Sequence, residues 1–208
     1  MHYLKDPTAI YERSFAIIGE EADLSGVPEP LRPIALRLIH ACGMTDILTD
    51  LRLSGDLVPA IRSAVAAGRP ILTDCEMLRS AIIRRQLPPE TDVICMLNDP
   101  AAAEHGRHLN VTRSAAAVSL WRPHLAGAVA VIGNAPTALF ALLELIDAGA
   151  PKPAAIVAFP VGFVGAAEAK SELAANPRDI PFATLLGRRG GSAMAAAVVN
   201  AVVAGERP

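Results

Sequence analysis

Short apolar runs alternate with longer amphipathic stretches along most of this chain. A short apolar run bounded by glycine, proline or polar residues is typical of a buried strand, and apolar residues spaced three and four apart are typical of a helix. The alternation predicts a parallel sheet with helices on both faces. The expected strands are residues 47–53, 70–73, 92–97, 128–132, 154–159 and 182–186.

Two helices are expected before the sheet. Asp6-Pro7 opens the first, because aspartate can cap a helix and proline suits its first position. The second covers residues 28–41, and Gly43 can end it. The pattern therefore predicts one domain over residues 1–208, a three-layer α/β/α fold with a mostly parallel sheet and an N-terminal helical segment at about 1–45. Further helices are expected at 56–67, 76–85, 112–120, 135–149, 165–174 and 192–204, and residues 47–53 also fit a helical turn.

Composition narrows the class of protein. The 208 residues are 52% hydrophobic and only 4% aromatic, so one aliphatic core is expected. The net charge of −2 and the lack of a long basic run argue against a nucleic-acid partner. The most apolar stretch, 154–167, is too short and too interrupted by glycine and proline for a membrane span. The three cysteines form no disulfide or zinc pattern, so we expect a cytoplasmic protein with reduced thiols.

In sheets of this kind the ligand lies outside the carboxyl ends of the strands. The loop 187–192 joins a strand to a helix, and it is either an ordinary turn or an anion site built from backbone amides. Asn134 is a candidate cap for the next helix and could also bond a ligand. Asp74 is interpreted as a cap too. Its charge, next to Cys75, disfavours a catalytic thiolate there.

His40 differs from the other histidines because it ends a helix, between an apolar run and small residues. Arg37 lies three residues earlier and so projects from nearly the same face. A histidine beside a cation tends to be neutral and can exchange a proton near pH 7. A structural histidine favoured by the helix dipole is the alternative. His105 and His108 are interpreted as a surface pair, since no third metal ligand stands near them.

Several segments together resemble the precorrin-8X methylmutase family over nearly the whole chain. Ala169 stands where the family often has serine. The segments are Asp6-Pro7-x-x-Ile10, Ser14-Phe15-x-x-Ile18, Arg37-x-Ile39-His40-x-Cys42-Gly43, Thr73-Asp74-x-Glu76-Met77, residues 131–139, Pro160-Val161-Gly162-Phe163-Val164, Ala167-x-x-Lys170-x-x-Leu173 and Gly187-Arg188-x-Gly190-Gly191-Ser192.

The resemblance implies an isomerase of cobalamin biosynthesis. It would shift a methyl group from C11 to C12 of precorrin-8X and give hydrogenobyrinate, without a metal or dissociable cofactor. It also implies a homodimer whose two subunits share the tetrapyrrole cleft, with no nucleic-acid or membrane partner. The implied residues are His40 as general acid, Ser14 and Arg37 for substrate binding, Arg113 near the macrocycle, and Asn134 and Arg188 by their motif positions.

Three alternatives stay open. The substrate could be cobalt-precorrin-8, on which the same fold and histidine would act. A tetrapyrrole carrier would keep the arginines but would not need His40. A hydrolase with Cys75 as nucleophile is the third.

Overall fold

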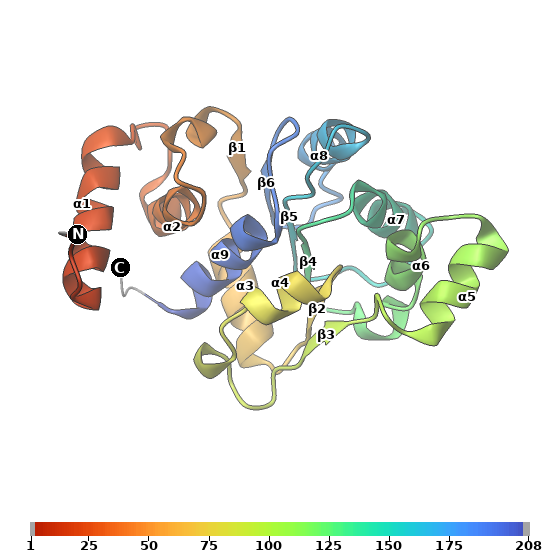
Figure 1. The fold of residues 1–208 in the computed structure, drawn as a ribbon. Coiled ribbons are helices and arrows are strands. Elements are labelled where there is room, and N and C mark those ends of the chain that lie inside the picture. Colours follow the sequence, from red (N-terminus) through yellow and green to blue (C-terminus); the bar gives the residue numbers. More distant parts are fainter. Residues whose placement is uncertain (1–2, 206–208) are drawn as a thin grey trace.

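The computed structural model describes residues 3–205, which form one six-stranded sheet (Figure 1). The strand order is β1-β6-β5-β4-β2-β3. Five strands run parallel, and β1 pairs antiparallel with β6 at one edge. The mostly parallel sheet is thus confirmed. The strands are β1 (Leu51–Leu53), β2 (Ile71–Thr73), β3 (Val93–Cys95), β4 (Val129–Ile132), β5 (Ala155–Ala158) and β6 (Phe182–Leu185).

Helices cover both faces of the sheet, as the three-layer prediction requires. One layer holds α2 (Arg32–Cys42), α3 (Leu57–Ala66), α4 (Glu76–Ala81) and α9 (Ser192–Val203), with α1 (Pro7–Glu21) outside α2. The other layer holds α6 (Arg113–Ser119), α7 (Pro136–Asp147) and α8 (Ala166–Ala175), with α5 (Pro100–Leu109) packed on α6. Short 3-10 helices lie at η1 (Glu29–Leu31), η2 (Thr45–Thr49), η3 (Arg84–Gln86) and η4 (Arg122–His124).

Strand β4 shows why the sheet is buried on both sides. Side chains of a strand alternate between its faces. Val129 and Val131 enter the core beneath α9, whereas Ala130 and Ile132 enter the core beneath α7. All four side chains are fully buried, so the run is apolar throughout instead of alternating with polar residues.

Two predicted helix ends are confirmed. The Asp6 carboxylate accepts a hydrogen bond from the Ala9 amide at 2.8 Å and so caps α1. Gly43 adopts the left-handed conformation at φ 69°, and its amide donates to the Ile39 carbonyl. Within residues 3–205, no helix has the length and apolarity needed to cross a bilayer.

Two elements differ from the prediction. Residues 47–53 are only partly a strand, because η2 occupies the first half and β1 begins at Leu51. Helix α5 is not indicated by the apolar pattern. It buries only the small residues Ala102 and Gly106, so its sequence carries no run of large apolar residues that would mark it as a core helix. The helix begins at Pro100, and the Asp99 carboxylate accepts from the Ala101 amide at 2.8 Å.

The loops after β4, β5 and β6 approach one another closely at the carboxyl edge of the sheet. A Cβ atom on Gly190 would overlap the Phe159 carbonyl oxygen. A Cβ atom on Gly133 would lie 2.7 Å from Ser192 Cα. Glycine at these two positions therefore lets three strand ends and the start of α9 meet at one place.

Candidate active site

His40 lies in the last turn of α2 and packs against α1. Its Nδ1 is 2.9 Å from the Ser14 hydroxyl oxygen. The Phe15 ring stacks on the imidazole with the centroids 5.0 Å apart, and the Tyr11 ring lies at 5.8 Å. Residues 11, 14 and 15 come together because three and four residues along a helix return to the same face. The imidazole is thus held on two sides while the residue remains exposed.

The bond to Ser14 fixes one nitrogen of His40 and leaves the other available. A serine hydroxyl can accept a hydrogen bond from Nδ1–H in both the neutral and the protonated imidazole. Nε2 can then carry a proton as an acid or offer a lone pair as a base. The arrangement is therefore suited to giving and retaking one proton at Nε2.

Arg37 shares the aromatic pair with His40, as their expected common face requires. Its guanidinium lies 5.3 Å from the Tyr11 ring centroid and 5.6 Å from that of Phe15. Cations bind the faces of aromatic rings in this way. Arg37 and His40 thus lie near each other because both contact the rings of Tyr11 and Phe15.

A hollow of about 180 Å³ adjoins the imidazole. Its lining includes Ser14, Ile17, Gly43 and Thr45. A larger cavity of about 570 Å³ lies next to it, between residues 21–28 and the η2–β1 segment. That cavity is lined by three carboxylates, those of Glu21, Asp23 and Asp46, and by one arginine, Arg52. Its charge does not suit a ligand that is itself rich in carboxylates.

Asp74 follows β2 and is buried, and it binds the turn after β4. Its carboxylate accepts hydrogen bonds from the amides of Gly133, Asn134 and Ala135 at 2.9, 3.0 and 2.9 Å. Burial raises the pKa of the Asp74 carboxyl, and the amide bonds act in the opposite direction. Both capping predictions were wrong. Asp74 does not cap α4, the helix that follows its strand, because its carboxylate binds the turn after β4 instead. The Asn134 side chain makes no capping bond to α7.

Asn134 and Arg113 lie at this same edge. The Asn134 side chain is exposed, and the backbone carbonyl of Asn134 accepts from the Val161 amide at 3.3 Å. Arg113 is the exposed first residue of α6. The hydroxyl oxygens of Thr112 and Thr137 are 2.7 Å apart, so the starts of α6 and α7 are joined.

Arg188 extends the edge on the loop after β6. Its guanidinium lies 5.2 Å from the centroid of the Phe163 ring, and its carbonyl accepts from the Gly162 amide. Phe163 is 84% exposed and Val164 is 89% exposed. A cation thus lies over an exposed aromatic ring, beside further apolar surface.

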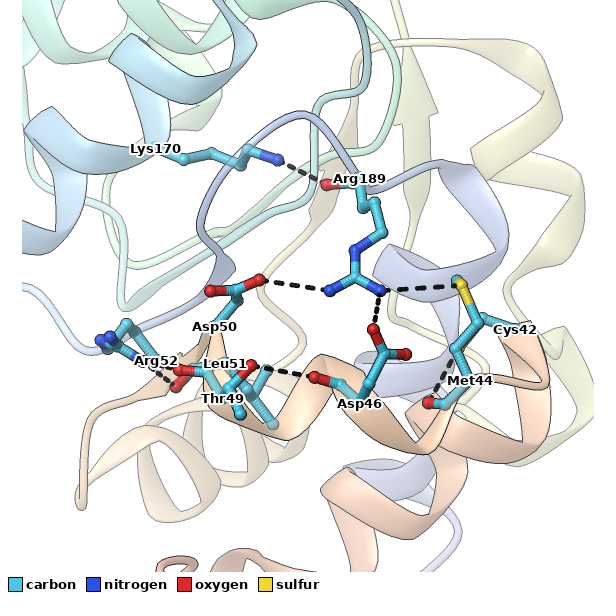
Figure 2. A network of polar contacts seen from close by, with 9 residues as sticks. All are labelled: Cys42, Met44, Asp46, Thr49, Asp50, Leu51, Arg52, Lys170 and Arg189. Carbon is cyan, nitrogen blue, oxygen red and sulfur yellow. Dashed lines mark hydrogen bonds and ion pairs between the residues drawn. The ribbon is translucent and has the colours of Figure 1, made fainter. Parts of the chain in front are cut away.

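Arg189 connects this edge to the segment after α2, a link that the sequence did not indicate. Figure 2 shows its guanidinium between two carboxylates, with Asp46 at 2.7 Å and Asp50 at 3.2 Å. Its carbonyl accepts from Lys170. The Tyr11 and Phe15 contacts to His40 were missed as well. The sequence signal that could have indicated them is the spacing of residues 11, 14 and 15, which places the two rings on the same helix face as Ser14.

The six predicted residues form two groups. Ser14 and Arg37 lie around His40. Asn134 and Arg188 lie on the loops after β4 and β6, and Arg113, the first residue of α6, lies near Asn134 at the same edge. Figure 1 places α1 and α2 at one end of the molecule and α5 and α6 at the other. Helix α2, which carries His40, and helix α6, which begins at Arg113, are consequently far apart within one chain.

Within residues 3–205, the thiols and the remaining histidines offer no competing centre. Cys75 is 7% exposed, and burial raises the pKa of its thiol, which disfavours the thiolate. Its Sγ lies 3.3 Å from the Ser192 hydroxyl. A buried thiol with a raised pKa does not suit a nucleophile, so the structure does not support the hydrolase alternative. Across residues 3–205, no group of three or more His, Cys, Asp or Glu side chains is arranged to hold a metal ion, and His105 and His108 are exposed on α5.

Known proteins resemble this chain over almost its full length. A model of the precorrin-8X methylmutase family matches residues 9–204. A precorrin-8X methylmutase of Pseudomonas aeruginosa is 55% identical over 96% of each chain. A cobalt-precorrin-8 methylmutase of Salmonella typhimurium is 35% identical over 98% of this chain and 97% of its own. The crystal structure of a precorrin-8X methylmutase from Thermus thermophilus superposes with a TM-score of 0.84 at 34% identity, covering 95% of each chain. The chain belongs to the precorrin-8X methylmutase family.

Proposed function

We propose that this chain converts precorrin-8X to hydrogenobyrinate by moving a methyl group from C11 to C12. The hydrogen-bonded Ser14–His40 pair, with Nε2 of the imidazole available, is the observation that carries the proposal. Identity of 55% to the Pseudomonas aeruginosa methylmutase supports the substrate class. We further propose that the reaction takes place in the cytoplasm.

A methyl shift within one molecule needs no protein nucleophile. Holding one tautomer of the macrocycle and stabilising charge as the conjugation changes are sufficient. In this proposal His40 gives the proton on Nε2 to the ring system, near the migration terminus or at a ring nitrogen, and takes it back afterwards. Arg37, Arg113, Arg188 and Asn134 bind the acetate and propionate groups at the rim, since guanidinium pairs with carboxylates in a bidentate way. No dissociable cofactor takes part in this step.

Visible absorption tests the proposal, because the methyl shift changes the conjugated path. The purified protein is expected to replace the precorrin-8X spectrum with that of hydrogenobyrinate. A small shift that then stays constant would indicate a tetrapyrrole carrier, and an unchanged spectrum would contradict the proposal.

Cobalt-precorrin-8 is the second candidate substrate, since the Salmonella typhimurium relative carries that name. The identities favour the metal-free substrate: 55% and 52% to two precorrin-8X methylmutases, against 35% to this relative. The same absorption assay with cobalt-precorrin-8 as substrate separates the two candidates.

We also propose that two copies of the chain form the cleft together. Arg113 lies at the other end of the molecule from His40. One ligand can contact both residues more readily if His40 comes from one subunit and Arg113 from the other. Helix α1 packs on α2, and exposed apolar side chains lie on or just before it, Leu4 at 51% and Ile10 at 46%.

Sedimentation velocity is therefore expected to give twice the chain mass of 21.7 kDa. Ile10→Lys is expected to shift the protein toward the monomer, because it places a charge in the proposed contact. Met77→Lys is the matched control, at 74% exposure on α4 and away from both α1 and the start of α6, and should sediment as the wild type does. A wild-type monomer at micromolar concentration would contradict a shared cleft.

A further inference from the structure

Lys170 of α8 is completely buried, which is unusual for a lysine. Its Nζ donates a hydrogen bond of 2.5 Å to the Arg189 carbonyl. Among the residues described, 3–205, no carboxylate lies within 4.0 Å of this nitrogen. Lys170 thus places its charge against a backbone carbonyl without an ion-pair partner.

Such burial opposes the charged form of the side chain. It lowers the pKa of Lys170 to about 8, and the field of Asp50 acts in the opposite direction. The ammonium is thus largely retained at neutral pH. A methionine of similar length would fill the same space without this desolvation. Core stability therefore does not account for a lysine at this position. What lysine provides and methionine does not is the hydrogen bond to the Arg189 carbonyl.

Arg189 is held at both its backbone and its side chain (Figure 2). Lys170 fixes the carbonyl from α8, while Asp46 and Asp50 fix the guanidinium from η2 and the residue that follows it. Helix η2 begins at Thr45, which lines the hollow beside His40. Arg189 therefore joins the loop after β6 to the chain beside the imidazole.

The residue before this link is Arg188, whose guanidinium lies over the exposed Phe163 ring. The carbonyl that Lys170 holds is that of the next residue, Arg189, on the same loop. A change in that carbonyl's position would move the Arg188 backbone and the base of its side chain. The Ser14–His40 pair, by contrast, is built from α1 and α2 and does not contact Lys170.

We propose that Lys170 is a positioning residue for substrate binding. Through Arg189 it sets the loop 187–191, so that Arg188 and Phe163 present a cation and an apolar ring to the tetrapyrrole. This inference rests on the proposed function. Lys170 contacts no substrate atom itself, and it determines how tightly the substrate binds more than how fast the proton moves.

Lys170→Met is expected to raise KM for precorrin-8X roughly tenfold while kcat changes less than about threefold. Lys170→Arg, which keeps the charge and the donor, should restore most of the affinity. The matched control is Lys152→Met, because Lys152 also donates to a backbone carbonyl, that of Arg178 at 2.7 Å, but is exposed in the connection between α7 and β5. It should leave both constants unchanged. A Lys170→Met enzyme with the wild-type KM would overturn the proposal.

Arg189→Gln decides the matter if Lys170→Met does not fold. It cuts the link to Asp46 and Asp50 but keeps the carbonyl that Lys170 binds. A raised KM with kcat retained supports the proposal, and an unchanged KM overturns it. Where both variants fold, the double variant should bind no more weakly than the weaker single variant, because both act on one loop.

A spectral titration with hydrogenobyrinate separates this proposal from the proposed function. Binding can be measured in a protein that turns nothing over. Roughly tenfold weaker binding by Lys170→Met supports the positioning role even if the wild type fails to convert precorrin-8X. Equal binding by Lys170→Met and wild type overturns the role even if conversion is normal.

Discussion

His40→Ala is expected to lower the rate of precorrin-8X conversion by about 100- to 10,000-fold, the range over which a positioned acid–base group contributes. The physical reason is the loss of Nε2 as proton donor and acceptor. Binding of the macrocycle should change little, because the carboxylate-binding arginines remain. Single-turnover absorption measurements give the rate, and a titration with hydrogenobyrinate gives the affinity.

Ser14→Ala is the companion variant for this measurement. It removes the hydrogen bond to Nδ1 but keeps the imidazole, so a smaller loss of about tenfold is expected. In the double variant, loss of Ser14 should cost nothing further, since there is no imidazole left to orient. Circular dichroism controls for folding, because His40 is exposed. Turnover by His40→Ala at the wild-type rate would rule out the acid–base role.

The sheet was predictable because its interior strands are short, unbroken apolar runs, a pattern typical of strands buried on both faces. Residues 128–132 form an unbroken apolar run, and a strand buried on both faces accounts for it. The order of the strands has no such local signal. β2 lies beside β4 and not only beside β3, so the contacts of Asp74 about sixty residues along the chain could not be read from its neighbours.

The candidate site was predictable in its residues but not in its contacts. His40 was identified at its helix end by local sequence. Its stacking with Phe15 depends on how α1 packs on α2, and this tertiary contact has no local signal in the sequence. Lys170 reads as an ordinary polar position on a helix. It is buried because the loop after β6 folds over it, and nothing near residue 170 in the sequence indicates that loop.

The second large effect concerns stability. Asp74→Asn is expected to lower the free energy of unfolding by about 3 kcal/mol, because three amides lose a charged acceptor and the new amide group cannot satisfy them all. Oδ1 accepts from Gly133, while Oδ2 accepts from both Asn134 and Ala135. Whichever way the asparagine turns, its NH2 group faces at least one N–H donor. Urea unfolding at neutral pH measures the loss.

Asp99→Asn is the matched control for this substitution. Asp99 caps α5 by accepting one hydrogen bond, from the Ala101 amide, and it is exposed. Asparagine caps helices about as well as aspartate, so the change there should stay within about 0.5 kcal/mol. An equally small change for Asp74→Asn would mean that the turn after β4 keeps its shape without the carboxylate. A large change confined to Asp74 would show that its buried charge holds the ends of β2 and β4 together, and with them the edge that carries Asn134.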